Sequence, residues 1–266
     1  MSRSLSSSIP SRLPHSLPPD ILAFLQRYPR QRPDPSASLN AHFYQGQAAA
    51  RPSRLKVDAL QDELRGNWSK LESNHAFVQW LFPIREQGVN HLAQPLQPHE
   101  IATIRQDSKA MARLVESYKI MLAFYGLRLV DAETGELALE DSTPAPSPAS
   151  YLRRFANLES HTHNFLRITR ILKCMGEFGL DQHPPSFLLY VLSLQASPSS
   201  PHLTSASLVR SIYTYWRWCV RDDVDRDFVR ARIDGVRDGS GSWSEGEYRE
   251  WVERRAGERN GATRTS

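Results

Sequence analysis

Apolar residues recur at steps of three and four along most of this chain, and this spacing limits the fold more than any other feature. Between residues 67 and 82 it places Trp68, Leu71 and Phe82 on one face of a helix, with Asn67 as a candidate N-cap. The same spacing recurs in 98–125, 161–178, 186–195 and 205–234. Strand-like alternation of apolar and polar residues is nearly absent. The sequence therefore predicts an all-α fold, a single helical domain of about seven to nine helices.

The N-terminal region differs in composition from the rest of the chain. Residues 1–36 are rich in serine, proline and arginine, and we expect a disordered tail with a short helix near 20–28. Arginines without acids are also typical of mitochondrial presequences. Four prolines between residues 10 and 19 would interrupt the amphipathic helix that import requires, so mitochondrial import is not expected.

We expect the helical domain to cover residues 37–235. Within it, the acidic and proline-rich segment 130–149 is predicted to be an inserted loop. Residues 236–266 form a polar tail, in which Ser244 and Glu247 have the spacing of a capping box before a short amphipathic helix. This last helix is predicted to dock loosely or to stay mobile.

Charge and cysteine content exclude several classes of protein. The formal net charge is +4, and basic and acidic residues are interleaved, which is too weak a bias to indicate nucleic-acid binding alone. Cys174 and Cys219 are the only cysteines, so there is no disulfide framework and no CxxC metal site, as in a reducing intracellular compartment. No stretch approaches the ~20 apolar residues of a transmembrane helix, which leaves peripheral contact with a membrane as the remaining form of association.

Motifs for catalysis, cofactors and metals are missing from the sequence. There is no GxSxG elbow, and the glycine-rich segment 238–247 lacks the preceding strand of a phosphate-binding loop. His161, His163 and Cys174 are ligand types for zinc, but residues two apart on a helix point about 200° away from each other. The sequence therefore predicts no enzyme, no cofactor and no metal site.

Basic residues at steps of three follow the helix predicted at 161–178. Arg167, Arg170 and Lys173 lie along one side, and Arg154 from the preceding segment adds to them. Such a set can bind phosphate, nucleic acid or an acidic peptide. The same spacing is typical of a solvated helix face opposite the apolar stripe, and this second interpretation is the one we favour from the sequence.

The segment NHAFVQWLFPIREQGVN (74–90) joins a helical apolar face to a polar turn. His75 falls on the predicted buried face, which Pro83 ends. The polar residues beyond Pro83 are not explained by burial, and the indole at position 80 fits either the core or a ligand groove. The candidate partner-binding residues from this segment are Trp80, Arg85, Glu86 and Asn90.

The segment 74–90 resembles the most characteristic stretch of the N-terminal domain of the opioid growth factor receptor family. Three further segments resemble the same family in the same order: LNAHFYQG (39–46), SYKIMLAFYGLRL (117–129) and YLRRFANLESHTHNFLRITRILKCMGEFGL (151–180). The similarity extends over residues 39–235. The last segment adds His163 and Asn164 to the candidate binding residues.

The resemblance implies an all-α domain that binds a peptide or protein and has no catalytic activity. The vertebrate receptor of this family binds the pentapeptide Met-enkephalin, restrains cell proliferation and is associated with the nucleus and its membrane. For this chain, the resemblance implies an intracellular location, in the nucleus or cytoplasm, with peripheral association with the nuclear membrane. Because the chain ends soon after the similar region, we expect a shorter member without the C-terminal repeats. The alternative is a phosphate- or nucleic-acid-binding helical domain that uses the basic helix face.

Overall fold

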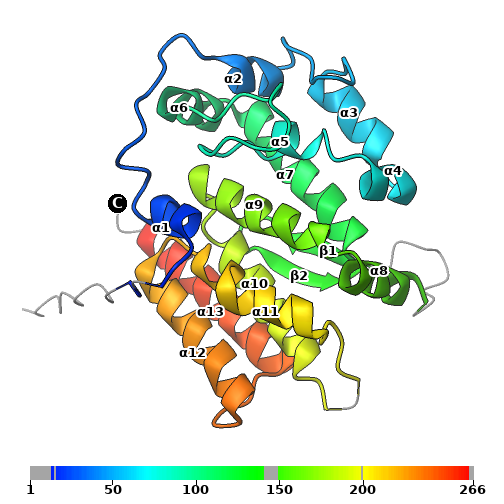
Figure 1. The fold of residues 1–266 in the computed structure, drawn as a ribbon. Helices are drawn as coiled ribbons and strands as arrows, with labels where there is room; N and C mark the ends of the chain where they lie inside the picture. Colours follow the sequence, from blue (N-terminus) through cyan, green and yellow to red (C-terminus); the bar gives the residue numbers. More distant parts are fainter. Residues whose placement is uncertain (1–12, 15, 141–148, 199, 264–266) are drawn as a thin grey trace, which may run out of the picture.

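The computed structural model describes residues 13, 14, 16–140, 149–198 and 200–263, and a central helix, α9 (His163–Glu177), organises them (Figure 1). One group of helices lies on one side of α9: α2 (Leu39–Tyr44), α3 (Val57–Leu64), α4 (Trp68–Ser73), α5 (Val78–Leu81), α6 (Pro98–Gln106) and α7 (Ser108–Phe124). A second group lies on the other: α10 (His183–Gln195), α11 (Ala206–Thr214), the 3-10 turn η1 (Trp216–Trp218), α12 (Asp223–Asp238) and α13 (Glu245–Thr263). At the two ends of α9 lie α8 (Ala149–Ser160) and α1 (Pro19–Leu25).

The prediction of an all-α fold is confirmed, because the described residues form thirteen α-helices and one small sheet. There are more helices than predicted, since apolar spacing continues across helix breaks. The segment 98–125 forms two helices that meet at Asp107, whose carboxylate accepts hydrogen bonds from the N–H groups of Lys109 and Ala110 at 2.9 and 3.0 Å. This cap starts a new helix, while both helices still turn apolar residues to the same core.

Two other predicted helices are divided in the same way. The segment 67–82 begins with the expected cap, in which the side chain of Asn67 accepts from the N–H of Lys70 at 3.1 Å. It is then interrupted at Asn74, whose side chain accepts from the N–H of Ala76 at 2.9 Å, a local bond that competes with the helix. The segment 205–234 is interrupted by η1, after which Asp222 caps α12.

The prediction of an inserted loop at 130–149 is wrong for the first half of that segment, which belongs to a β-hairpin. Strands β1 (Leu127–Asp131) and β2 (Glu136–Leu139) pair antiparallel, with Leu127 opposite Leu139 and Leu129 opposite Leu137. Gly135 has φ +76°, the left-handed conformation that a tight turn requires and glycine adopts without strain. The acidic composition concealed a short alternation of leucines. The proline-rich part of the predicted loop, 141–148, lies outside the described residues.

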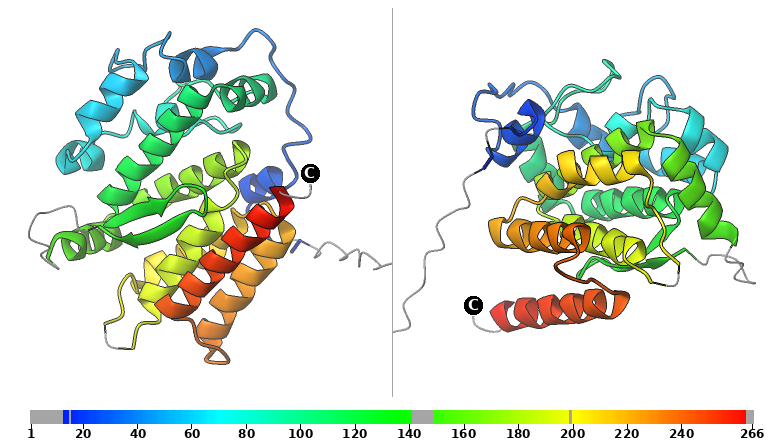
Figure 2. Two further views of the ribbon diagram at one scale, coloured as in Figure 1. Left: turned by 180° about the vertical axis from the view of Figure 1, so that it is seen from behind. Right: turned by 60° about the horizontal axis from the view of Figure 1, so that its bottom comes forward.

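The C-terminal helix α13 is a full part of the domain, contrary to the prediction of a short, loosely docked helix. The predicted capping box is present, with Ser244 and Glu247 bonded to each other in both directions. The buried side chains of Tyr248 and Trp251 then pack the helix against α10 on the back of the molecule (Figure 2). The hydroxyl of Tyr248 accepts from the N–H of Leu137 in the hairpin at 2.8 Å. Helix α13, in the segment predicted as a polar tail, therefore packs on the domain.

Part of the segment before residue 36 also packs on the domain. Helix α1 lies against the end of α9, and Ile21 and Phe24 are fully buried there. Residues 1–12 of the predicted tail lie outside the described residues. No helix among the described residues is long and apolar enough to cross a membrane.

Candidate partner-binding site

Arg167 lies in the middle of α9 and closes the C-terminal end of α4. Its guanidinium donates to the carbonyl oxygens of Leu71 at 2.6 Å, Glu72 at 3.3 Å and Asn74 at 3.1 Å. The last carbonyls of a helix have no N–H partner within that helix, so a side chain from elsewhere must satisfy them. The side chain is only 5% exposed, which makes Arg167 a buried cap for α4.

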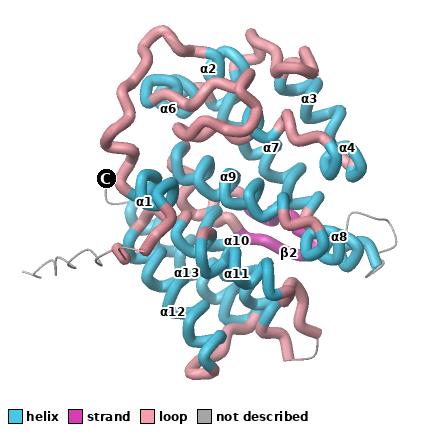
Figure 3. Tube along the Cα trace, viewed as in Figure 1, coloured by secondary structure: helices cyan, strands magenta, loops and turns pink. Residues whose placement is uncertain are grey.

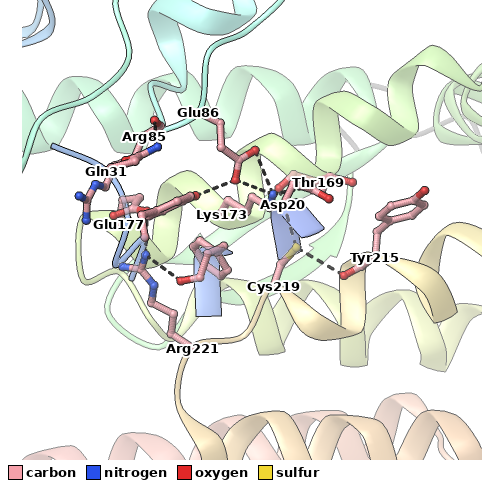
Figure 4. A network of polar contacts seen from close by, with 12 residues as sticks. Asp20, Gln31, Arg85, Glu86, Thr169, Lys173, Glu177, Tyr215, Cys219 and Arg221 are labelled. Atoms are coloured by element: carbon pink, nitrogen blue, oxygen red, sulfur yellow. Dashed lines mark hydrogen bonds and ion pairs between the residues drawn. The ribbon is translucent and has the colours of Figure 1, made fainter. Parts of the chain in front are cut away.

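Arg170 and Lys173 continue the same arrangement one and two turns later. The Nε–H of Arg170 donates to the carbonyl oxygen of Phe82 at 2.7 Å, and burial lowers the pKa of this guanidinium to about 10. The amine of Lys173 is 1% exposed and lies 2.7 Å from Asp20 and 2.8 Å from Glu86 (Figure 4). Burial opposes its charge, yet these two carboxylates hold the pKa of Lys173 above its ordinary value.

The basic helix face is therefore not solvated, and the sequence interpretation that favoured a solvated face is wrong. The fourth basic residue, Arg154, is half-buried with its guanidinium 5.1 Å from the ring centroid of Trp68. Helix α9 is covered on both sides, so its basic side chains meet carbonyls, carboxylates and rings of the protein. The alternative prediction, a phosphate or nucleic-acid site on this face, lacks an accessible basic surface, because Arg167 and Lys173 are buried.

Trp80 and Asn90 hold a neighbouring turn in place. Trp80 is 1% exposed, and its Nε1–H donates to the carbonyl oxygen of Arg51 at 2.9 Å. The amide of Asn90 donates to the same carbonyl at 3.1 Å and to that of Ala76 at 3.0 Å. A surface pocket of about 280 Å³ opens beside Trp80 and the turn at 51–53. The indole thus belongs mainly to the core, with one edge on this pocket.

Arg85 and Glu86 fix the N-terminal segment onto the domain. The guanidinium of Arg85 donates to the carbonyl oxygen of Arg27 at 2.9 Å, and the carbonyl of Arg85 accepts from Gln31 at 2.7 Å. Glu86 accepts from the hydroxyl of Tyr28 at 2.8 Å, in addition to its ion pair inside the domain. The polar turn after Pro83 is therefore occupied by contacts within the chain.

His163 and Asn164 meet Glu72 of α4 at the start of α9. Asn164 is fully buried and donates to the carboxylate at 3.3 Å, while the Nε2 atom of His163 lies 2.8 Å from the other carboxylate oxygen. Burial opposes ionisation of Glu72, but hydrogen bonds from Asn157 and Asn164 hold its pKa below the ordinary value. Burial and the charge of Arg167 lower the pKa of His163. These residues join α4, α8 and α9.

The described residues include no group of three or more His, Cys, Asp or Glu side chains that could hold a metal ion. His75, predicted to be buried, is exposed, and its Nδ1 atom lies 3.0 Å from the guanidinium of Arg167. Both cysteines are buried, and burial raises the pKa of Cys219 to about 12 and that of Cys174 well above its ordinary value. Neither thiol has the low pKa of a nucleophile.

An open groove between α9 and α11 is the feature that sequence reasoning missed. It has a volume of about 500 Å³ and is lined by Thr162, Phe165, Leu166, Thr169, Ala206, Ser207, Arg210, Ser211 and Tyr215. Leu166 is 71% exposed, although it lies within an otherwise well-covered helix. Arg210 is exposed and makes no ion pair with any described residue. The signal available in the sequence was Leu166 itself, an apolar residue that lies outside the apolar stripe of the helix predicted at 161–178.

Comparison with known proteins gives the family. Residues 33–235 match the family described as the opioid growth factor receptor (OGFr) conserved region. Opioid growth factor receptor of Mus musculus is 36% identical over 174 residues, which cover 63% of this chain and 26% of that protein. Opioid growth factor receptor-like protein 1 of Xenopus tropicalis is 33% identical over 199 residues, 73% of this chain and 37% of that protein.

The chain thus spans between about a quarter and two fifths of the length of these relatives. No solved structure matches it. The match nevertheless covers most of the chain, from the loop before α2 to the last turns of α12. The chain belongs to the opioid growth factor receptor family.

Proposed function

We propose that this chain is a receptor-like binding domain for a peptide or protein, without enzymatic activity. Relatives named as receptors support the binding role. The observation that carries the proposal is the exposed pair of Leu166 and Arg210 in the groove between α9 and α11. The other predicted site residues are engaged in contacts within the chain, which leaves this groove as the better surface for a partner.

The groove combines apolar and polar lining residues. Phe165, Leu166 and Tyr215 offer apolar area, and covering an exposed leucine contributes up to about 1.5–3 kcal/mol to binding. Hydroxyl groups of the threonine and serine residues that line the walls can bond to a peptide backbone. Arg210 can form a bidentate pair with a carboxylate. The preferred partner is therefore a peptide with an apolar side chain followed by a carboxylate.

Calorimetric titration with Met-enkephalin, a pentapeptide with apolar side chains and a terminal carboxylate, tests the narrow form of this proposal. Binding to the wild-type chain is expected, with a loss of about tenfold or more in Leu166→Glu and in Arg210→Glu. Val89→Glu is the matched control, because Val89 is 95% exposed and lies outside the groove. Equal affinity of all four proteins would remove the groove as the binding site.

Absence of heat at high micromolar Met-enkephalin, with the chain folded by circular dichroism, would remove this peptide as the ligand. The wider proposal is then tested by affinity capture of peptides and proteins from cells of the source organism. A partner retained by wild type and Val89→Glu but lost in Leu166→Glu is the expected result. Identical captures by the three proteins would contradict the proposal.

A further inference from the structure

The short helix α1 covers a group of charged side chains on the body of the domain. We call Arg85, Glu86, Lys173, Glu177 and Arg221 the α1 cradle (Figure 4). Two ion pairs are internal to it: Lys173 with Glu86 at 2.8 Å and Arg221 with Glu177 at 2.7 Å. All five residues lie within the family region, 33–235, whereas α1 and Tyr28 precede that region. The cradle and its cover therefore come from different parts of the chain.

The cover consists of α1 and Tyr28, and three of its side chains, at positions four residues apart, contact the cradle. The carboxylate of Asp20 lies 2.7 Å from the amine of Lys173, and the hydroxyl of Tyr28 donates to the carboxylate of Glu86 at 2.8 Å. Between them the buried ring of Phe24 has its centroid 4.3 Å from the guanidinium of Arg221 and 5.9 Å from the amine of Lys173. Each contact covers a charged group that would otherwise face solvent.

The cover is joined to the domain by an extended segment. Residues 29–36 are all exposed and include three prolines, and Figure 3 shows the connection from α1 to α2 as a long loop along the edge of the molecule. A helix of seven residues has little stability of its own in water, so α1 depends on its contacts with the cradle. The two internal ion pairs of the cradle do not involve α1 and would remain after its release.

We propose that the α1 cradle is a peptide-binding site that residues 19–31 occupy within the same chain. Its partner in trans is a peptide with an acidic residue, a phenylalanine and a tyrosine spaced four apart, which replaces Asp20, Phe24 and Tyr28. The internal segment competes with that peptide at the millimolar effective concentration of a short tether. This site is separate from the α9–α11 groove and does not depend on the proposed function.

Fluorescence anisotropy of a labelled synthetic peptide of residues 18–31 tests the proposal on the full chain. The Phe24→Ala chain, in which the internal competitor is weakened and the cradle is unchanged, is expected to bind the peptide at least about tenfold more tightly than wild type. A control peptide with alanine in place of the phenylalanine is expected to bind about tenfold more weakly than the parent peptide. The additional substitution Leu166→Glu is expected to leave the affinity unchanged, which separates this site from the groove.

If Phe24→Ala does not fold by circular dichroism, Tyr28→Phe replaces it, because that change removes only the hydroxyl donor to Glu86. A gain of about threefold in peptide affinity is then expected. Equal affinity for wild-type and weakened chains, or for parent and control peptides, would overturn the proposal. A dimer of the weakened chain that excludes the peptide would also overturn it, since the occupant would then be a second copy of α1.

Discussion

Replacement of Arg167 by alanine tests the central structural claim, that the basic residues of α9 are caps and not a ligand surface. The guanidinium donates to three backbone carbonyls at the C-terminal end of α4, at 2.6, 3.3 and 3.1 Å, and to the amide oxygen of Asn164 at 3.1 Å. A buried acceptor left without a donor costs about 1–3 kcal/mol. The carbonyls of Glu72 and Asn74 belong to half-exposed residues and can recover water, so the loss is set mainly by Leu71.

The expected loss of unfolding free energy for Arg167→Ala is about 3 kcal/mol. For a domain of this size, that corresponds to a fall in Tm of about 6–12 °C, measured by differential scanning calorimetry. Arg167→Lys keeps the charge but has a single donor group, so a smaller fall is expected. Arg153→Ala is the matched control, because Arg153 is an exposed arginine on α8, and its Tm is expected to change by less than about 1 °C. An unchanged Tm in Arg167→Ala would refute the capping argument.

Three further predictions concern buried groups. Burial raises the pKa of Asp225 to about 6, so between pH 4 and 6 the folded chain binds a proton that the unfolded chain has lost. The free energy of unfolding of the wild-type chain therefore falls as pH rises through that window. Relative to wild type, the unfolding free energy of Asp225→Asn, measured by urea titration, is expected to rise by about 3 kcal/mol between pH 4 and pH 7. Cys174 and Cys219 are expected to resist an aromatic disulfide reagent at pH 8 until urea unfolds the chain, and fast labelling of the folded protein would contradict their burial. Trp80→Phe leaves the carbonyl of Arg51 with one donor fewer and is expected to cost about 1 kcal/mol in thermal unfolding, whereas enhanced stability would contradict the indole hydrogen bond.

Features set within one or two turns of chain could be predicted from the sequence. The cap at Asn67 and the capping box at Ser244 depend on neighbouring residues, and both are present as predicted. Helix α9 lies within the predicted range 161–178 and differs from it by two residues at its start and one at its end. Longer helices were predicted where two shorter ones occur, because a cap such as Asp107 ends one helix without changing which side faces the core. The fold class therefore followed from spacing, and the number of helices did not.

Contacts between distant segments could not be predicted from spacing. Whether a row of arginine and lysine residues is solvated or buried depends on which segments cover the helix. Helix α9 is covered by segments about 90 and 150 residues away in the chain, as the bonds of Arg167 to Asn74 and of Lys173 to Asp20 show. Tyr248, which fixes α13 to the hairpin, bonds to a residue 111 positions earlier. Periodicity describes one face of one helix and contains no information about such partners.

The segment 74–90 can now be understood from its contacts with α9. Arg167 binds the carbonyl of Asn74, Arg170 binds that of Phe82, and Lys173 pairs with Glu86. Basic residues three apart on the helix thus meet successive points along the segment, in the same order. One helical turn of slippage would break all three contacts at once, so the pattern fixes the register between the segment and α9. Backbone carbonyls already occupy the guanidinium groups of Arg167 and Arg170. A ligand is therefore to be sought at the α9–α11 groove, or at the α1 cradle once α1 has left it.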